Sequence, residues 1–460
     1  MPQSLLRWLL VGVIVAVLAA GATIGGLMLL FPRHAPQSVA AVSPSVKSDA
    51  PLIGTPVPPE LQPRVSIMPP TETQVSPATV AEAEPPGAAA ATATGRDYVI
   101  LQIGDSHTAA DLFTGEVRDR LQAKFGAGGL FLPPGIPKAG VQSAEFEIRA
   151  DDAWTYEAMS AADQPDRFWL SGYTASANQS GAMVSFMARG QQAFDSIDVS
   201  FLKTNGGGQA DILLDDNVVD HVSLDGRPGQ PLIRRLMPQN GKVGSFKTLK
   251  VVTTSSGPVE LSGVFIDQRQ SGVSYLSVGF PGARVTVLNR MSPGNLADDM
   301  ARIDPDMVVL AFGTNEGFDD NLDTAEYKKT LSGIVDLLKQ GNAERRLVIV
   351  GPPPGVRKED SCRDVHNACG TPPVSGACWA EPPKLTAVRD AEREVAQAAG
   401  AIFWDWSSVL PTACALEQGH LGDPAIFGPD RVHMTGRGYR DSADAFAQVL
   451  IPLVSKAMGS

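Results

Sequence analysis

Two groups of residues in this chain have the types and spacing needed for nucleophilic catalysis. Ser106 lies in the segment Gly104-Asp105-Ser106-His107, directly after the apolar run Tyr98–Ile103. A serine at a strand-to-helix turn projects its hydroxyl from the sheet edge, where backbone N–H groups and the helix dipole can stabilise an oxyanion. Ser and Asp are also ordinary helix caps, so this segment alone is a weak signal.

The base that would accept the serine proton can be narrowed by elimination, because the chain has only six histidines. His107 adjoins Ser106, and neighbouring side chains usually diverge too far for proton transfer. Four others lie in the amino-terminal segment, a β-rich stretch or a cysteine-rich region: His34, His221, His366 and His420. His433 remains, and Asp430, three residues earlier, can orient its imidazole and stabilise the protonated form. A surface D-x-x-H before a final helix capped by Thr435 is the alternative.

The elements that must position these residues follow a strand–helix alternation. After Tyr98–Ile103, buried strands are predicted at 275–280, 307–312, 347–350 and 401–404. Helical patterns occur at 112–126, 326–340 and 385–400. Such alternation indicates a parallel, helix-covered sheet, in which ligands bind at the carboxyl ends of strands. Ser106 and Asn315 fall at such ends, and the segment 430–433 falls in a later loop.

A β-rich stretch interrupts this pattern. Residues 143–270 contain short alternating or β-branched runs separated by turn clusters such as NGGGQ and DGRPGQ. We expect an antiparallel sandwich inserted into the α/β domain, which then comprises residues 96–142 and 271–460. Aromatic residues near its start favour core packing, with stacking on a sugar ring as the alternative: Trp154, Trp169 and Tyr173.

Together, four segments resemble the blocks of the SGNH/GDSL hydrolases, in the same order: GDSH at 104–107, the loop of Gly282, GTNE at 313–316 and DRVH at 430–433. The resemblance covers most of 97–142 and 271–460. It implies a three-layer sandwich around a parallel sheet, with Ser106 as nucleophile, His433 as base and then acid, and Asp430 as its orienter. It also implies an oxyanion hole formed by the Ser106 and Gly282 N–H groups and the Asn315 side chain.

The third block departs from the family pattern, because Glu316 stands where Asp is usual. With the GDSHT form and the β-rich stretch, this departure is similar to the branch that contains bacterial peptidoglycan O-acetylesterases. That branch implies a jelly-roll insert like a carbohydrate-binding module. Gly279 competes with Gly282 for the second-block role, and the match to FPGA favours Gly282.

The amino-terminal part predicts export and tethering. Residues 8–31 carry no charge and as a helix would cover a bilayer core, so we expect residues 1–34 to be an uncleaved anchor. A cleaved signal peptide ending near Ala20-Gly21-Ala22 is the alternative. Residues 35–95 hold twelve of the 36 prolines and no aromatic residue, a composition typical of a disordered linker. The predicted location is a single-pass inner-membrane protein with its catalytic domain in the periplasm.

Cysteine usage agrees with export. The four cysteines lie close together: Cys362, Cys369, Cys378 and Cys414. We expect two disulfides, with the pairing open among three connectivities. A metal site formed by Cys362, His366, Cys369 and Cys378 is the alternative, although the spacing is not that of known zinc sites.

The charge balance excludes one class of partner, and the motifs define the predicted reaction. A net charge of −12 without clustered Lys and Arg argues against nucleic-acid binding. We expect a membrane-tethered periplasmic serine esterase, needing no metal or organic cofactor, that removes small acyl groups, mainly acetyl, from a cell-envelope glycan such as peptidoglycan. An O-acetyltransferase acting on an envelope polysaccharide and a glycan-binding protein with a vestigial site are the alternatives. The oligomeric state is not predicted.

Overall fold

The computed structural model describes residues 97–134, 140–162, 168–238, 243–268, 272–361, 369 and 377–459. The predicted anchor and linker lie outside these residues, as do three members of the candidate lists: His34, Cys362 and His366. Among the described helices, none combines the length and the apolar character that a membrane crossing requires.

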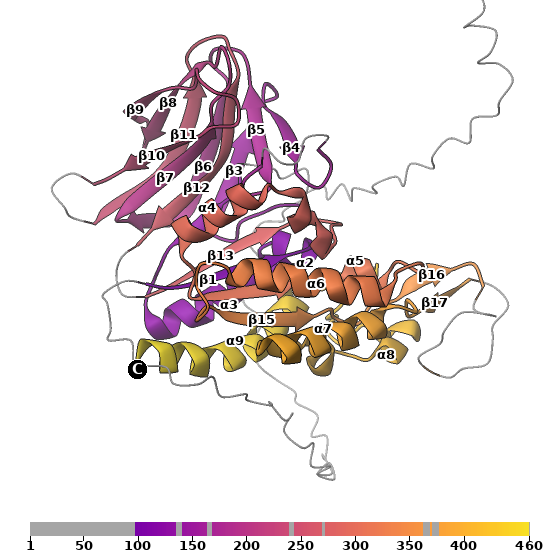
Figure 1. Ribbon diagram of the computed structural model, residues 1–460. Coiled ribbons are helices and arrows are strands. Elements are labelled where there is room, and N and C mark those ends of the chain that lie inside the picture. The colour runs from indigo at the N-terminus through magenta and orange to yellow at the C-terminus, as the bar shows by residue number, and fades with distance from the viewer. Residues whose placement is uncertain are drawn as a thin grey trace, which may run out of the picture. The chain divides into compact units, whose positions relative to one another are not determined.

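A five-stranded parallel sheet forms the centre of the α/β part (Figure 1). Its order is β13 (Val273–Gly279), β1 (Tyr98–Gly104), β14 (Met307–Ala311), β15 (Arg346–Gly351) and β18 (Ile402–Asp405). Every neighbouring pair is parallel. These strands are the five predicted apolar runs, with ends displaced by one or two residues. They are almost entirely buried, because helices cover both faces.

Helices form the two outer layers, as predicted for a three-layer α/β sandwich. One face is covered by α3 (Leu112–Phe125) and α9 (Gly436–Met458), and the other by α4 (Pro293–Ile303), α6 (Thr324–Lys339) and α7 (Leu385–Ala399). Successive residues of β1 point to opposite faces: Ile100 packs with α3 and α9, whereas Leu101 packs with α6 and α7. The predicted fold class is confirmed for this part of the chain.

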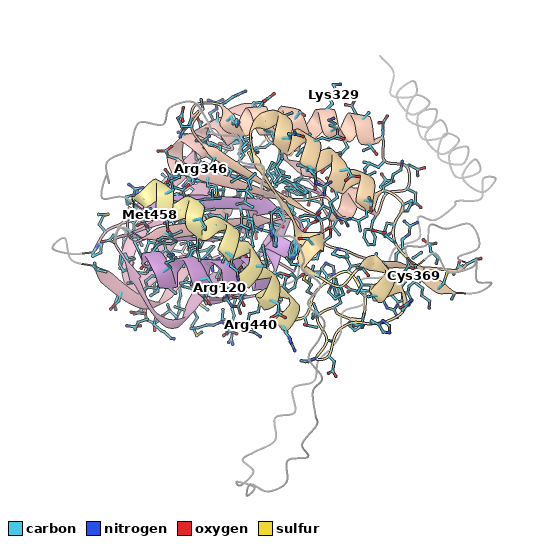
Figure 2. All side chains as sticks on the ribbon, turned by 90° about the horizontal axis from the view of Figure 1, so that it is seen from below. Arg120, Lys329, Arg346, Cys369, Arg440 and Met458 are labelled. Atoms are coloured by element: carbon cyan, nitrogen blue, oxygen red, sulfur yellow. A yellow bond between two sulfur atoms is a disulfide. The ribbon has the colours of Figure 1, made fainter. Side chains whose placement is uncertain are left out.

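The helices α3 and α9 lie side by side, marked by Arg120 and Arg440 in Figure 2. Arg120 of α3 pairs with Asp444, and Arg440 of α9 pairs with Glu116 at 3.2 Å. The side chain of Thr435 caps α9 by accepting from Gly438 N, as the sequence predicts. The loop that carries Asp430 and His433 therefore ends at α9, a helix that is fixed against α3.

Between α3 and β13 the chain forms two antiparallel sheets. The first contains β10 (Pro231–Leu236), β7 (Ser196–Leu202), β12 (Val259–Asp267), β5 (Tyr173–Ala177) and β4 (Thr155–Ala158), with β2 (Leu130–Leu132) also paired to β12. The second contains β3 (Phe146–Ala150), β6 (Met183–Phe194), β11 (Gly244–Thr253), β8 (Gln209–Leu214) and β9 (Asn217–Ser223). Both sheets contribute side chains to one core, which includes Phe186, Phe201 and Phe246. A jelly-roll or carbohydrate-binding character of these sheets stays a prediction.

Contacts cross the predicted division at residue 143 in both directions. The strand β2 comes before that residue yet pairs with β12. Conversely, Met159, Phe168 and Tyr173 are buried in the core of the α/β part. The Tyr173 hydroxyl donates to the Gly279 carbonyl at 2.9 Å. The two parts of the chain therefore share core residues.

Two of the three aromatic residues near the start of the β-rich stretch, Trp154 and Tyr173, serve in packing, as the sequence favoured. Trp154 is 4% exposed in the core of the two antiparallel sheets, and Tyr173 is 2% exposed in the α/β core. Rings buried in this way are not available to stack on a sugar. Trp169 is half-buried.

Candidate active site

Three strand ends meet at the centre of the site. The register pairs Gly104 at the end of β1 with Gly279 of β13 and with Ala311 of β14. Neither glycine has room for a side chain: a Cβ at Gly104 would lie 2.5 Å from Ala311 O, and one at Gly279 would lie 2.2 Å from Ala109 N. The short helix α2 (Ser106–Ala109) therefore sits directly on the sheet edge, and the loops that follow these strands converge on Ser106.

Ser106 is the first residue of α2, where the sequence places it. The cap is Asp105, whose Oδ1 accepts from His107 N at 3.0 Å. Asp105 is 1% exposed, and burial raises its pKa to about 6. The carboxyl therefore fixes the turn that presents the Ser106 hydroxyl, which is half-buried at the surface.

The structure joins the three residues proposed for proton transfer in one hydrogen-bonded series. Ser106 Oγ lies 2.9 Å from His433 Nε2, and His433 Nδ1 lies 2.7 Å from Asp430 Oδ2. The second oxygen of Asp430 accepts from Val432 N at 3.1 Å and from His433 N at 3.0 Å. A short loop thus holds the carboxylate against the imidazole.

This geometry favours the ion pair that a general base needs. The hydrogen bond with Asp430 raises the pKa of His433, against the opposing effect of partial burial. Burial alone would raise the pKa of Asp430, but the His433 side chain and two backbone N–H groups together lower it. The His433 and Asp430 side chains are 48% and 52% exposed, so solvent screens their attraction and water has access to the pair.

His107 does not face the Ser106 hydroxyl as a base. It is 2% exposed, its Nδ1 is hydrogen-bonded to the Tyr439 hydroxyl at 2.9 Å, and burial lowers its pKa to about 3. A neutral, buried imidazole at this position supports the ring of His433, whose centroid lies 5.1 Å away. His221 lies on β9, hydrogen-bonded to Asp211, and takes no part in the site.

Asn315 and Gly282 lie on loops adjoining the site, where oxyanion donors are expected. Asn315 is the second residue of α5 (Thr314–Gly317), and its Nδ2 donates to Ala283 O at 2.8 Å. An amide nitrogen carries two hydrogens, so one donor of Asn315 stays available. Gly282 has a φ of +72° and no atom within 4 Å of a Cβ position. Its oxyanion role and that of Gly279 stay predictions.

Glu316, the departure from the family pattern, joins two loops of the site. Its Oε1 accepts from Val285 N at 2.6 Å and its Oε2 from Gly313 N at 3.1 Å. The side chain is 1% exposed, and burial raises its pKa to about 7. The carboxyl thereby fixes the loop of Gly282 relative to the helix of Asn315, which a shorter Asp would reach less easily.

A buried acid next to Glu316 was missed by sequence reasoning. Glu392 of α7 accepts from the Tyr327 hydroxyl at 2.6 Å, and burial raises its pKa well above the ordinary value. A Cβ at Gly313 would lie 2.5 Å from Glu392 Oε1, so the acid lies directly beneath the third-block loop. Its spacing from Leu385, Val388 and Val395 places it on the apolar face of the helix, and that position was the available signal.

The three described cysteines are disulfide-bonded. Cys369 is bonded to Cys414, and Cys378 is also disulfide-bonded. The metal site considered for Cys369 and Cys378 is therefore wrong, because a disulfide sulfur is not a thiolate ligand. Within the described ranges, no cluster of three or more His, Cys, Asp or Glu side chains could hold a metal ion.

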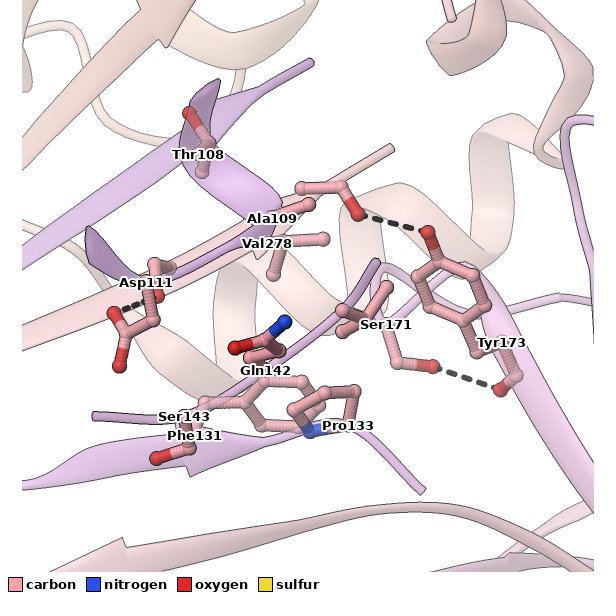
Figure 3. A pocket seen from close by; sticks show the side chains of 13 residues that line it. Thr108, Ala109, Asp111, Phe131, Pro133, Gln142, Ser143, Ser171, Tyr173 and Val278 are labelled. Carbon is pink, nitrogen blue, oxygen red and sulfur yellow. Dashed lines mark hydrogen bonds between the residues drawn. The ribbon is translucent and has the colours of Figure 1, made fainter. Parts of the chain in front are cut away.

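A small pocket lies beside α2, on the side of β2 and β13 (Figure 3). Its lining includes Thr108, Ala109, Tyr173 and Gly279. Its described lining includes none of the three proton-transfer residues. We therefore regard it as a packing gap behind the nucleophile turn.

Comparison with known proteins agrees with this geometry. Residues 263–440 match the model of the GDSL-like lipase/acylhydrolase family. That range contains Gly282, Asn315, Asp430 and His433, whereas Ser106 precedes it because the two antiparallel sheets separate the first block from the others. No curated protein matches the sequence.

Three solved structures align with the chain. A peptidoglycan O-acetylesterase aligns with a TM-score of 0.62 and 25% identity, over 79% of this chain and 93% of that one. A family two carbohydrate esterase from Cellvibrio japonicus aligns with a TM-score of 0.26 and 14% identity, over 68% and 98%. An acetyl xylan esterase aligns with a TM-score of 0.28 and 18% identity, over 38% and 80%.

The strand order, the convergence of four loops on Ser106 and the family match lead to one conclusion. Residues 263–440 form a GDSL-like lipase/acylhydrolase domain, and the chain resembles the SGNH/GDSL hydrolases of the peptidoglycan O-acetylesterase branch, which supports a carboxylic ester hydrolase.

Proposed function

We propose that this protein is a serine esterase that removes O-acetyl groups from a cell-envelope glycan, with peptidoglycan as the first candidate. The observation that carries the reaction is the hydrogen-bonded series Ser106–His433–Asp430. The similarity to a peptidoglycan O-acetylesterase at a TM-score of 0.62 supports the substrate class.

Acylation would begin at Ser106. His433 Nε2 accepts the hydroxyl proton while Ser106 Oγ attacks the ester carbonyl carbon, giving a tetrahedral oxyanion. Asp430 holds the imidazole in the tautomer whose Nε2 is free and stabilises the imidazolium. When the C–O bond to the sugar breaks, His433 returns the proton to the leaving sugar oxygen, and acetyl-Ser106 remains.

Deacylation would repeat the same steps with water. His433 takes a proton from a water molecule, which attacks the acetyl carbonyl, and the second tetrahedral intermediate releases acetate as the proton returns to Ser106 Oγ. The half-exposed His433 and Asp430 side chains give water direct access to the base. This access favours hydrolysis over transfer of the acetyl group to a sugar.

The oxyanion would be held by N–H groups from three loops. We assign these donors to Ser106 N, Gly282 N and the free N–H of Asn315 Nδ2. Glu316 supports this assignment, because it hydrogen-bonds to backbone N–H groups on both sides of the hole. The donors are thus fixed before substrate binds, so little reorganisation accompanies the reaction.

The remaining parts of the chain fit the same proposal. Residues 8–31 would anchor the protein in the inner membrane of a bacterium, and residues 35–95 would carry the enzyme into the periplasm toward the glycan. The two antiparallel sheets would form a jelly-roll module that adds contacts to the polysaccharide. The catalytic part would comprise residues 96–142 and 271–460. Residues such as Tyr173, from the β-rich stretch, would complete its core.

The direct test measures acetate released from O-acetylated peptidoglycan, O-acetylated xylan and an acetylated exopolysaccharide, each with and without unacetylated glycan acceptors. We expect release from peptidoglycan by the full-length protein and none by Ser106→Ala. Ser180→Ala, on an exposed turn of the antiparallel sheets, is the matched control and keeps wild-type turnover of p-nitrophenyl acetate. Turnover of p-nitrophenyl acetate by Ser106→Ala at the wild-type rate would contradict the proposal.

Two outcomes would replace it by other functions. Acetylation of an acceptor glycan in place of acetate release would identify a transferase. Binding of glycan without Ser106-dependent turnover of any ester would identify a vestigial site, which the intact hydrogen-bonded series argues against.

A further inference from the structure

Arg431 occupies an unusual position between the two residues that activate the nucleophile. Its φ is +56°, in the left-handed region that side chains other than glycine rarely adopt. Its backbone is tied on both sides: Arg431 N donates to Gly428 O at 3.0 Å, and Arg431 O accepts from Val356 N at 3.2 Å. The left-handed residue creates the turn that directs Asp430 and His433 toward each other. Because this backbone conformation is unfavourable for arginine, other contacts must stabilise it.

The Arg431 side chain stabilises this turn through contacts on the side away from Asp430 and His433. Its Nη1 donates to Leu416 O at 2.7 Å and to Glu417 O at 3.1 Å. These carbonyls belong to the last two residues of α8 (Ala413–Glu417), and Leu416 O also accepts from Gly419 N at 3.0 Å, so Arg431 binds the C-terminal turn of this helix. The guanidinium also lies 4.1 Å from the ring centroid of Trp379, a cation–π contact.

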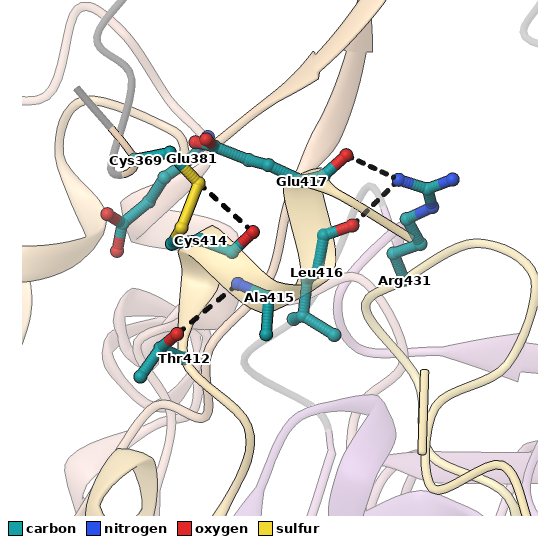
Figure 4. The surroundings of a disulfide bond; sticks show 8 residues. All are labelled: Cys369, Glu381, Thr412, Cys414, Ala415, Leu416, Glu417 and Arg431. Atoms are coloured by element: carbon teal, nitrogen blue, oxygen red, sulfur yellow. Dashed lines mark hydrogen bonds between the residues drawn. A yellow bond between two sulfur atoms is a disulfide. The ribbon is translucent and has the colours of Figure 1, made fainter. Parts of the chain in front are cut away.

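Both anchors of Arg431, α8 and Trp379, lie next to disulfide-bonded cysteines, and Figure 4 shows the contacts with α8. Cys414 is the second residue of α8, and its disulfide to Cys369 ties this helix to a residue that precedes β17 in the chain. Trp379 lies on β17 (Cys378–Ala380) beside the disulfide-bonded Cys378. Glu381 N donates to the Glu417 side chain at 3.2 Å, which joins the end of β17 to the end of α8.

We propose that Arg431 is a positioning residue: it fixes the Asp430–His433 pair against α8 and Trp379, so that the Cys369–Cys414 disulfide supports catalysis from outside the site. This inference rests on the proposed esterase function. Arg431 acts through the backbone turn and touches neither the nucleophile nor the reacting ester. Reduction of the disulfide would free α8, relax Arg431 and lengthen the contact between Asp430 and His433.

A change in the pH profile separates this role from simple loss of stability. The groups that face His433 are Asp430 from its own loop and Asp105 and His107 from the β1–α2 turn. Of these, Asp430 makes the direct hydrogen bond that raises the pKa of His433. A displaced Asp430 therefore lowers that pKa, and the acidic limb of the activity profile moves to lower pH.

The experiment compares Arg431→Ala and Arg431→Lys with the full-length wild type, using p-nitrophenyl acetate across a pH series. For Arg431→Ala we expect kcat to fall roughly 10- to 100-fold, as small misplacements of catalytic groups do, with KM changed less than about twofold. The acidic midpoint of kcat/KM should move to lower pH. Arg431→Lys should recover part of kcat, because an ammonium can donate to the α8 carbonyls but lacks the planar guanidinium that lies over the Trp379 ring.

Arg437→Ala is the matched control, since Arg437 is an exposed arginine six residues later that pairs with Asp441 at 3.3 Å on α9. We expect it to leave kcat and the acidic midpoint unchanged. An Arg431→Ala enzyme with the wild-type pH profile would overturn the proposal, whether or not its activity is lower.

The disulfide arm uses a Cys369→Ser/Cys414→Ser double variant and a dithiothreitol series on wild type and Arg431→Ala. The double variant should show the same shift of the acidic midpoint, and dithiothreitol should slow the wild type but hardly affect Arg431→Ala, whose link is already lost. Equal slowing of both proteins would contradict the coupling. If the double variant fails to fold by circular dichroism, the dithiothreitol series decides.

The two proposals fail in different ways. If Ser106→Ala turns over ester at the wild-type rate, the esterase assignment is wrong, and the role of Arg431 is wrong with it. Turnover that depends on Ser106 but is indifferent to Arg431 removes only the positioning role.

Discussion

Ser106 Oγ and His433 Nε2 lie 2.9 Å apart, although 327 residues separate them in the chain. Two features produce this contact. The helix α2 packs closely against Gly104 and Gly279, at the ends of β1 and β13, and α9 packs along α3. The first fixes the serine and the second fixes the loop that leads to the histidine. Changes near each feature give distinct, measurable effects.

Replacement of Asp430 by Asn should change both the rate and its pH dependence. The amide oxygen can still accept from Val432 N and His433 N, which leaves an NH2 group facing His433 Nδ1. The imidazole then places its proton on Nε2 and cannot accept one from Ser106, so kcat should fall roughly 100- to 10,000-fold. Because the Asp430 bond raises the pKa of His433, the acidic limb should move to lower pH. A pH series of kcat/KM measures both, and an unmoved limb would show that Asp430 does not set this pKa.

Removal of the Asn315 amide should act mainly on the transition state. Asn315→Ala loses a donor for the oxyanion, which typically lowers kcat roughly 100- to 1,000-fold, while KM changes little. Asn217→Ala is the matched control, because Asn217 also donates from its Nδ2 to one carbonyl, that of Asp215, but lies on β9. Steady-state kinetics and urea unfolding together separate the outcomes. An Asn315→Ala enzyme with normal kcat would exclude Asn315 from the oxyanion hole.

The two candidate glycines of the second block should respond differently to alanine. At Gly279 a Cβ would lie 2.2 Å from Ala109 N, so α2 must move and both activity and stability should fall sharply. At Gly282 the Cβ meets open space, and only the positive φ opposes it, at about 1–2 kcal/mol. Its N–H remains, so we expect Gly282→Ala to keep kcat within about tenfold of wild type. Thermal unfolding and esterase assays test this, and equal tolerance at both positions would contradict the packing described here.

Glu316 should make the folded state less stable as the pH rises. Its pKa is about 7 in the folded protein against an ordinary value of 4.5, so the protonated form is favoured by folding. This contribution to stability is complete below about pH 4.5 and is lost as the pH rises through 7, on the order of 3 kcal/mol. Glu316→Gln keeps an acceptor for Val285 N and cannot titrate.

The measurement is urea unfolding at pH 5, 6, 7 and 8 of wild type, Glu316→Gln and Asp105→Asn. The free energy of unfolding should fall less steeply with pH in Glu316→Gln than in wild type. Asp105→Asn should flatten the curve at lower pH, because burial raises the pKa of Asp105 only to about 6. Parallel curves for wild type and Glu316→Gln would refute the raised pKa of Glu316.

The sequence predicted the parts of this site that depend on local patterns. A buried strand that ends in glycine or an apolar residue is readable from its length and composition, so the loops of Ser106 and Asn315 were placed correctly. The cap of α9 at Thr435 follows from a local hydrogen bond of the same kind. For Asp430 and His433, the spacing within one loop was sufficient to predict that they pair.

Contacts between distant segments were not predictable in this way. The cysteine pairing remained open, because three connectivities satisfy the same spacing, and Cys369–Cys414 is decided by where α8 lies. The left-handed turn at Arg431 and its reach to α8 depend on a side chain crossing between loops. The shared core between the α/β part and the antiparallel sheets likewise depends on tertiary packing of segments far apart in sequence.

The order of strands in the parallel sheet bears on how the chain folds. Both neighbours of β1 lie beyond the antiparallel sheets, and Gly272 N reaches Asp97 Oδ1 across 175 residues. During synthesis β1 therefore stays without a partner until the sheets have been made, and pairings over such distances form slowly. We expect β2 and β12, which pair with each other, to close this long loop first. The β1–α2 turn that carries Ser106 would then become ordered only after the antiparallel sheets have formed.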